Sequence, residues 1–235
     1  MKLKCYALIC LLVGLAFAST SYAQDGGDIV KPVFSPKGFF TARPDFRKCI
    51  YPLCGGYFVK SVNKKKTRCA DGSLQPECYV VSIEFYGTKR FGPFAPGNKN
   101  PLLLRGKIVP KEFKGFGKLG VFVAKEAFKS VTDKTAAGRF FGVQNNGIVC
   151  VTTPCFSWDQ YVLNTKRINK LSGVNLDKVG ADKKELEYAY KILANRGVLL
   201  GAGRNVVTKE MTGPGLHFVA SQFYLPIRPF IVPLK

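Results

Sequence analysis

Short stretches of largely apolar residues, rich in aromatic and β-branched side chains, run through the second half of the chain. They cover residues 140–144, 158–163, 168–174, 198–207 and 217–224. This composition is typical of β-strands, and the Asn145-Asn-Gly147 sequence after the first stretch is a turn signal. We therefore expect five strands in this half.

One stretch has helical periodicity instead. Its apolar residues recur at intervals of three or four: Leu186, Ala189, Tyr190 and Leu193. Asp182, followed three residues later by Glu185, has the pattern of a capping box, in which each residue satisfies a free backbone group of the first turn. Gly197 is the expected stop. These features predict one helix between the third and fourth strands.

Three strands, a helix and two strands follow one another in the order of a five-stranded Greek-key barrel of the oligonucleotide/oligosaccharide-binding type. The first half of the chain keeps the outer strands but has a Gly/Pro-rich stretch, residues 90–101, in place of the helix. It also adds a hairpin that turns at residues 69–72 and returns along residues 78–85. The expected fold class is β-rich α+β, built from two barrel-like modules with one clear helix in the second. A different α+β module is the alternative.

The chain matches itself when it is shifted by 101 residues. The matched positions are Phe39-Phe40 with Phe140-Phe141, Cys49 with Cys150, Cys54 with Cys155, Tyr57 with Trp158, and Asn63 with Asn164. A second block, residues 111–117, matches residues 209–215, and the order of elements is preserved. We interpret this as a tandem duplication of a module of about 95 residues, which lies within the size range of domains.

The N-terminus has the pattern of a secretory signal peptide. A positive start at Lys2 and Lys4 precedes an apolar run that is too short to span a membrane, and Ser21-Tyr-Ala23 supplies a cleavage site. We therefore expect a secreted or periplasmic protein. The expected parts are a signal peptide (1–23), an N-terminal extension (24–37), module one (38–132), a joint (133–137), and module two with a Pro-rich tail (138–235). The tail either lies across a module and closes its core or is an exposed segment that binds a partner.

Six cysteines follow the signal peptide: Cys49, Cys54, Cys69, Cys78, Cys150 and Cys155. An even number in an exported chain favours disulfides. If the modules fold independently, Cys150 pairs with Cys155. The repeat then pairs Cys49 with Cys54, which leaves Cys69 for Cys78. The alternatives are a four-thiolate zinc site formed by the two Cys-x4-Cys pairs, and free or redox-active thiols.

The chain carries 36 Lys and Arg against 15 Asp and Glu, a formal net charge of +21. Such an excess favours anionic partners, and it also keeps a protein soluble without any specific partner. The candidate anion-binding residues are Lys64, Lys65, Lys66 and Arg68, in a loop after Asn63, and Lys89 with Arg90, beside Phe91 and Phe94. A further basic group, Lys111, Lys114 and Lys118, is interleaved with Phe113 and Phe116. Basic residues among aromatics can hold a polyanion; a solvated loop tip, with the two phenylalanines in the core, is the alternative.

Catalytic patterns are missing from the sequence. There is no nucleophile elbow with a Ser, His and acid set, no His-Glu-x-x-His and no phosphate-binding loop. The single histidine, His217, matches Val121 in the repeat, and Glu112 matches Glu210. We expect no catalytic residues, no cofactor and no metal.

Two segments carry a resemblance to a known family. They are Lys48-Cys-Ile-Tyr-Pro-Leu-Cys-Gly-Gly-Tyr-Phe-Val-Lys-Ser-Val-Asn63, followed by Cys69-Ala-Asp-Gly and Glu77-Cys-Tyr-Val, and Phe141-Gly-Val-Gln-Asn-Asn-Gly-Ile-Val-Cys-Val-Thr-Thr-Pro-Cys155, followed by Leu163-Asn164. They resemble a family of exported bacterial proteins of unknown function. The resemblance implies an exported location and a cysteine-stapled architecture, and it implies no activity or substrate.

The expected function is that of an exported, non-catalytic binding or structural protein of the bacterial envelope or medium. Its expected partner is a polyanion (nucleic acid, anionic polysaccharide or envelope polymer) or an extracellular protein. The first alternative is an inhibitor of an extracellular enzyme that presents the disulfide-bounded loop at residues 50–53 in a fixed shape. The second is an enzyme with an unrecognised site.

Overall fold

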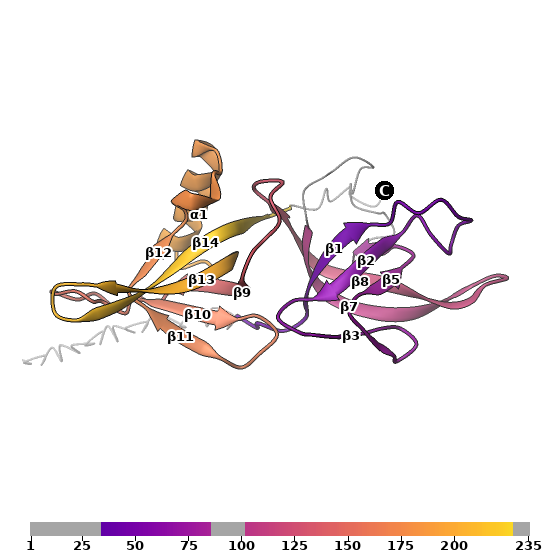
Figure 1. Cartoon of the computed structure of the whole chain (residues 1–235), viewed down its shortest axis with the longest axis horizontal. Helices are drawn as coiled ribbons and strands as arrows, with labels where there is room; N and C mark the ends of the chain where they lie inside the picture. The colour runs from indigo at the N-terminus through magenta and orange to yellow at the C-terminus, as the bar shows by residue number, and fades with distance from the viewer. Residues whose placement is uncertain (1–33, 86–101, 228–235) are drawn as a thin grey trace, which may run out of the picture. The chain divides into compact units, whose positions relative to one another are not determined.

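The computed structural model describes residues 34–85 and 102–227 (Figure 1). Three predictions lie outside these residues. They concern the signal peptide with most of the N-terminal extension (1–33), Lys89 with the Gly/Pro-rich stretch that begins at Arg90 (90–101), and the end of the tail (228–235).

The described chain is β-rich with one α-helix, as predicted. The first half contains β1 (Phe39–Pro44), β2 (Tyr57–Ser61), β3 (Thr67–Arg68), β4 (Leu74–Gln75), β5 (Cys78–Val80), β6 (Ile83–Phe85), β7 (Leu102–Phe113) and β8 (Gly117–Ser130). The second half contains β9 (Arg139–Asn145), β10 (Trp158–Val162), β11 (Ile168–Leu171), β12 (Gly173–Asn175), the short 3-10 helix η1 (Asp177–Val179), α1 (Lys183–Ala194), β13 (Leu199–Lys209) and β14 (Pro214–Pro226). All five strands expected in the second half are present, and the third is divided into β11 and β12.

One large sheet joins the two halves. Its strand order is β11-β10-β9-β13-β14-β8-β7-β1-β2-β5, while β12 pairs in parallel with β14 and β6 pairs in parallel with β8. The expected barrel is not found among the described strands, because this path is open at β11 and β5. Instead of closing on the first strand of its own half, the end of β14 pairs with β8 at Tyr224↔Ser130, Leu225↔Lys129 and Pro226↔Phe128.

The two halves of the sheet have the same strand order when each is followed inward from its end. The second half runs β11-β10-β9-β13-β14, and the first half runs β5-β2-β1-β7-β8. The pair β7–β8 has a bulge at Arg105/Gly106, and the pair β13–β14 has one at Ala202/Gly203. A Cβ added to Gly106 would lie 2.1 Å from a backbone oxygen of the neighbouring strand, and one added to Gly203 would lie 2.2 Å from another. Both bulges therefore require glycine at the same place in the strand pair.

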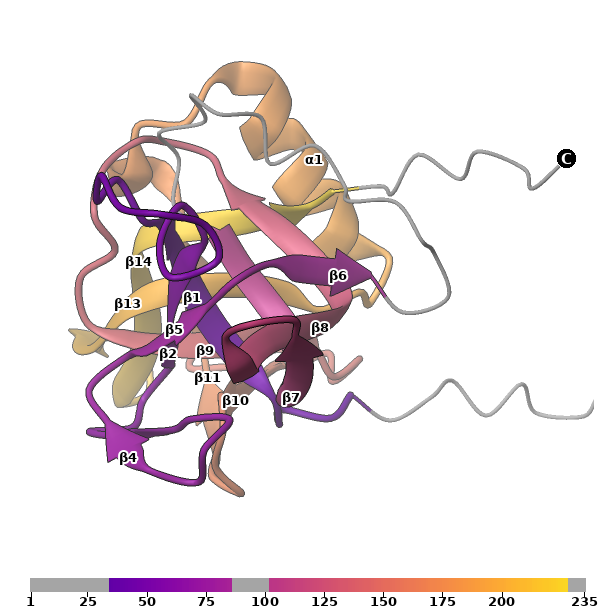
Figure 2. The same cartoon turned by 90° about the vertical axis from the view of Figure 1, so that its right-hand side faces the viewer.

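The helix begins where its sequence predicts. Asp182 is the N-cap, and its side chain accepts a hydrogen bond from the Glu185 backbone N–H at 2.8 Å. Figure 2 shows α1 above β14, and its Ala189 belongs to the core of the second half. Two expectations differ from the structure. Tyr190 is 42% exposed, and the helix ends at Ala194, with Asn195 as its C-cap and left-handed Arg196 (φ 55°) before the expected stop at Gly197.

Three groups of buried residues make up the core. One belongs to the second half and one to the first. The third combines side chains from both halves: Phe39, Val62, Leu103, Leu163, Leu200 and Tyr224. The described residues also form a single compact unit. The two halves therefore share apolar contacts as well as a sheet.

The beginning of the C-terminal tail packs against the first half. Ile227 is partly buried against that core, and its N–H donates to the Ala127 carbonyl at 2.8 Å. No helix among the described residues has the length and apolar character needed to cross a membrane.

Candidate functional site

Three disulfides close loops in the two halves: Cys49–Cys54, Cys69–Cys78 and Cys150–Cys155. These are the pairs expected from the repeat. Sulfur atoms joined in this way are not available as the thiolate ligands of the alternative zinc site. Within the described residues there is no cluster of three or more His, Cys, Asp or Glu side chains able to hold a metal ion.

The loop that contains the first disulfide, residues 45–56, is here called the first clipped loop. Its base is held by an ion pair between a buried carboxylate and a partly exposed arginine. The Asp45 side chain is only 1% exposed and that of Arg47 is 55% exposed, and the carboxylate lies 2.8 Å from Arg47 Nη2. The Arg47 Nε and backbone N–H also donate to this carboxylate, at 2.9 and 3.0 Å. These bonds hold the pKa of Asp45 below its ordinary value, the side-chain bond from Arg47 being the largest cause. The Asp45 N–H donates to the Gly56 carbonyl at 2.9 Å and so joins the two ends of the loop.

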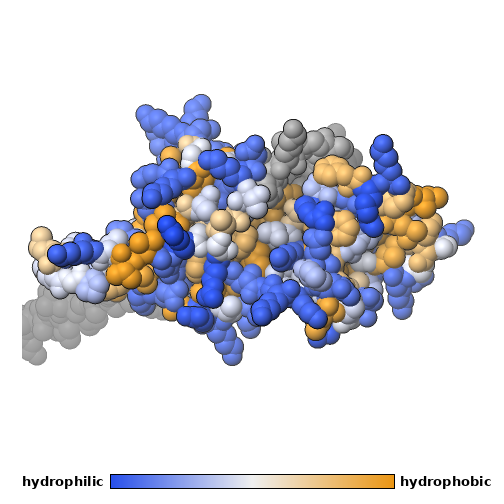
Figure 3. Space-filling view, in the orientation of Figure 1, coloured by the Kyte–Doolittle hydropathy of each residue, from blue (hydrophilic) through white to orange (hydrophobic). Residues whose placement is uncertain are grey.

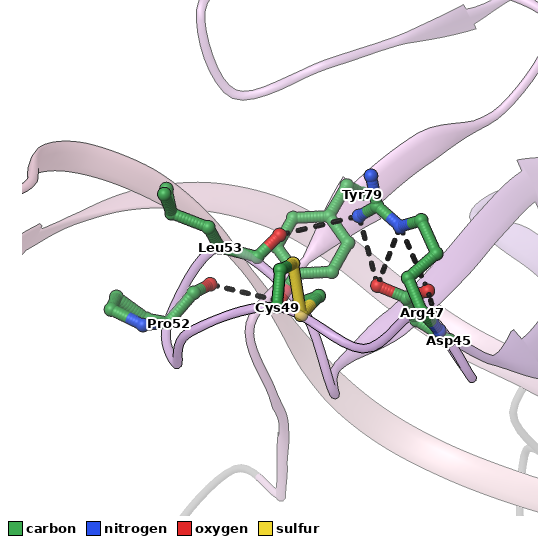
Figure 4. The surroundings of a disulfide bond; sticks show 7 residues. Asp45, Arg47, Cys49, Pro52, Leu53 and Tyr79 are labelled. Carbon is green, nitrogen blue, oxygen red and sulfur yellow. Dashed lines mark hydrogen bonds and ion pairs between the residues drawn. A yellow bond between two sulfur atoms is a disulfide. The ribbon is translucent and has the colours of Figure 1, made fainter.

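The Arg47 guanidinium connects this base to the far side of the loop (Figure 4). It donates to the Leu53 carbonyl at 3.2 Å and lies 5.0 Å from the Phe58 ring centroid and 5.4 Å from that of Tyr79. The Tyr79 hydroxyl donates to the Pro52 carbonyl at 2.9 Å. Cation–π contact and hydrogen bonding thus supplement the disulfide, and the loop is fixed at several points along its length.

The outer surface of the first clipped loop is apolar. Its exposed large side chains are Phe46 (83%), Ile50 (68%), Tyr51 (64%) and Leu53 (45%). Figure 3 shows hydrophobic residues gathered over this part of the molecule, at the right of the view. Large apolar side chains that gather on a surface, rather than occurring singly, mark a site of interaction.

The corresponding loop of the second half, residues 146–157, is fixed differently. Asn146 and Ile148 occupy the positions of Asp45 and Arg47, the ion pair of the first clipped loop. The Asn146 side chain donates to the Phe156 carbonyl, and the Thr212 N–H and hydroxyl donate to the Thr153 carbonyl at 2.9 and 2.6 Å. Its outer surface is also apolar, with Ile148, Val149 and Val151 exposed by 51%, 93% and 103%.

The predicted anion-binding residues lie on a turn and short strand after β2. Lys64, Lys65, Lys66 and Arg68 are all exposed, and none takes part in an ion pair within the described residues. They differ in this from Lys111, whose Nζ lies 2.6 Å from Glu84 Oε1. In that second basic group Phe116 is 40% exposed and Phe113 is half-buried. Neither belongs to a described core cluster, so the alternative that places both phenylalanines in the core is not supported.

Two asparagines link the halves. Asn63 (φ 57°) accepts from the Phe140 N–H at 3.0 Å and donates to the Phe140 and Leu163 carbonyls at 2.7 and 3.0 Å. Asn164 (φ 59°) makes the same contacts in reverse, to the N–H and carbonyl of Phe39 and to the carbonyl of residue 62. The repeat singled out both asparagines, but not this role. Asn tolerates the left-handed conformation, and that was the available signal for a structural turn.

The single histidine lies in a cluster that the sequence did not predict. Glu210 Oε1 accepts from the Ser172 hydroxyl at 2.6 Å and lies 3.1 Å from His217 Nε2. In a hydrolytic triad the imidazole lies between the hydroxyl and the acid, whereas here the carboxylate lies between the other two. The Ser172 oxygen also accepts the Leu216 N–H at 2.9 Å. The hydrogen bonds to the Glu210 carboxylate, chiefly that from Ser172, hold its pKa below the ordinary value. Together with the Leu216 bond they anchor the β13–β14 hairpin. Glu112, the counterpart of Glu210, is exposed.

No protein with a curated description and no solved structure matches the chain. A family described as a domain of unknown function, DUF6748, matches residues 38–230 and so includes both halves of the sheet. The expected resemblance to a family of unknown function is confirmed, and the chain belongs to this family.

Proposed function

We propose that the protein is an exported, non-catalytic binding protein whose ligand is an anionic polymer. Lys64, Lys65, Lys66 and Arg68 are its primary contacts. The observation that carries the proposal is that these four side chains are exposed on one short segment without an ion pair among the described residues. Residues 46–70 also contain no Asp or Glu. Cations without a neighbouring carboxylate keep their full attraction for a ligand.

The proposal includes the tandem duplication. It is supported by the same strand order in both halves, by the paired bulges at Gly106 and Gly203, and by left-handed Asn63 and Asn164 at matching positions. Export is supported by the signal-peptide pattern and by three disulfides, which persist in oxidising compartments.

Binding to immobilised heparin in a series of salt concentrations tests the proposal. Because ligand binding by lysines releases counterions, retention should fall steeply as salt rises. The triple variant Lys64→Glu/Lys65→Glu/Lys66→Glu should bind at least about tenfold more weakly at low salt. The matched control, Lys178→Glu/Lys183→Glu/Lys184→Glu, makes the same change in charge at exposed residues around η1 and α1. Equal loss in both variants, or retention that does not respond to salt, would contradict the proposal.

A second candidate function, inhibition of an extracellular enzyme, is favoured by one specific observation. The network of Asp45, Arg47 and Tyr79 fixes a loop whose apolar tip, with Tyr51 and Leu53, is exposed. A loop ordered before binding loses less conformational entropy when it is bound.

A panel of extracellular proteases provides the test of this second function. The double variant Tyr51→Ala/Leu53→Ala should lose inhibition, whereas Val149→Ala/Val151→Ala in the loop of the second half should keep it. If the unmodified protein inhibits none of the proteases, this candidate loses its support.

A further inference from the structure

The turn that carries the lysines lies beside a second turn from the other half. The Asn63 side chain donates to the Leu163 carbonyl at 3.0 Å, and the Asn164 side chain donates to the Val62 carbonyl at 3.0 Å. Each turn therefore holds the backbone of the other. We refer to residues 62–66 and 163–167 together as the paired turns.

Both members of the paired turns carry exposed cations. The first contributes Lys64, Lys65 and Lys66, and the second contributes Lys166 and Arg167. The Asn164 N–H donates to the Pro36 carbonyl at 2.6 Å. The next residue, Lys37, is exposed and therefore lies beside the same turn. None of these six side chains takes part in an ion pair within the described residues.

Carboxylates are missing from the segments that meet here. Residues 34–44, 46–70 and 160–176 contain neither Asp nor Glu. Two carboxylates on neighbouring strands are neutralised by cations of their own. Glu126 pairs with Arg105 at 2.7 Å, and Asp159 pairs with Lys170 at 2.6 Å. The charges of the two turns therefore add to one positive field.

We propose that the paired turns form one composite binding surface, contributed by both halves, for a linear acidic polysaccharide. This inference rests on the proposed function and extends it to residues about a hundred positions away in the sequence. Lysines on exposed turns act as mobile point charges, which suits a chain of repeated sulfate or phosphate groups better than a single anion. None of the described aromatic residues with large exposure lies in residues 36–40, 62–68 or 163–167. Single-stranded nucleic acid is held largely by stacking on aromatic rings, so the polysaccharide is favoured.

The test measures heparin oligosaccharide binding by the full chain after signal removal, at several salt concentrations. The variants are Lys64→Gln/Lys65→Gln on the first turn, Lys166→Gln/Arg167→Gln on the second, and Lys183→Gln/Lys184→Gln on α1 as a control with the same change in charge. Each turn variant should weaken binding at least about fivefold and lower the salt slope by roughly 1.5, since a contact contributes about 0.7–0.9. The helix variant should leave the salt slope unchanged. Equal melting temperatures show that all variants fold.

The outcomes separate the two proposals. If only the first-turn variant weakens binding, the composite surface is wrong and the proposed function stands. If both turn variants behave like the helix variant, or the unmodified chain does not bind in a salt-dependent manner, the proposed function fails as well. Tenfold tighter binding of single-stranded DNA than of heparin with the same number of charges would overturn the assignment to a polysaccharide.

Discussion

At the scale of single residues, Asp45 is the group whose contribution to the first clipped loop should depend on pH. Its pKa is lowered from an ordinary value of 3.8, chiefly by the hydrogen bond from Arg47. A carboxylate whose pKa is lower in the folded state stabilises that state above its unfolded pKa, and the stabilisation is lost as the pH falls through the folded pKa. We expect the amides of residues 49–54 to be well protected from exchange at pH 6, relative to the intrinsic exchange rate at that pH, and to lose this protection below about pH 4.

The variant Asp45→Asn separates this effect from general acid unfolding. Its loop amides should already be less protected at pH 6, and their protection relative to the intrinsic exchange rate should change little down to about pH 3.5. Asp133→Asn, at an exposed position between the halves, is the control and should behave like the unmodified protein. If exchange in Asp45→Asn depends on pH as steeply as in the unmodified protein, the ion pair does not fix the loop.

Removal of two different tyrosine hydroxyls should have opposite effects on the free energy of unfolding. The Tyr224 hydroxyl is buried without a hydrogen-bond partner among the described residues, and burial raises the pKa of this group. Tyr224→Phe removes a polar atom that loses its water on folding, so the free energy of unfolding should stay equal or rise by up to about 1 kcal/mol. Tyr79→Phe removes the bond to the Pro52 carbonyl and should lower it by about 1 kcal/mol. Urea unfolding measures both, and a loss of stability in Tyr224→Phe would show that its hydroxyl has a partner.

At the scale of elements, the turn after β2 should depend on one side chain. Asn63→Ala removes three hydrogen bonds to backbone groups of the second half and places alanine at φ 57°. We expect the free energy of unfolding to fall by about 2–4 kcal/mol. Asn195→Ala, which removes one exposed bond at the end of α1, should cost less than about 1 kcal/mol. Equal effects of the two variants would show that Asn63 does not link the halves.

The sequence predicted those elements whose signals are local. The start of α1 followed from Asp182 and Glu185, which lie three residues apart, and the strands of the second half followed from the composition of each segment and the turn signals between them. The role of Asn63 was not predicted, because its partner Phe140 lies 77 residues away and a local pattern carries no information about that contact. The prediction of a closed barrel was wrong for a related reason. Strand order along the chain does not say whether the last strand of a module closes on its own first strand or, like β14, pairs with β8.

At the scale of the whole molecule, the same limit applies to the candidate site. The lysine turn was visible as a run of charge, whereas its pairing with Lys166 and Arg167 depends on two asparagines that cross between the halves. The apolar tip of the first clipped loop was visible only in part. The composition of the loop does not show that Asp45 is buried beneath it or that the Arg47 guanidinium lies over two rings.

Shared packing also predicts that the halves do not fold separately. A fragment of residues 134–235 would keep its own core. It would lose β8, which pairs with the end of β14, and the packing of Phe39, Val62 and Leu103 around Tyr224. The fragment would then present an uncovered apolar surface and an unpaired strand edge, both of which promote association between chains. We expect it to be oligomeric in size-exclusion chromatography.

Circular dichroism during heating provides the second measurement on this fragment. The full chain should unfold in one cooperative transition, because its halves share a core and a sheet, whereas the fragment should unfold without a sharp transition or at a much lower temperature. Adding the complementary fragment, residues 24–133, should restore the single transition and the size of the full chain. A fragment that is monomeric and melts within a few degrees of the full chain would mean that each half is stable by itself. In that case the contacts of Asn63 and Asn164 would position the paired turns without being needed for folding.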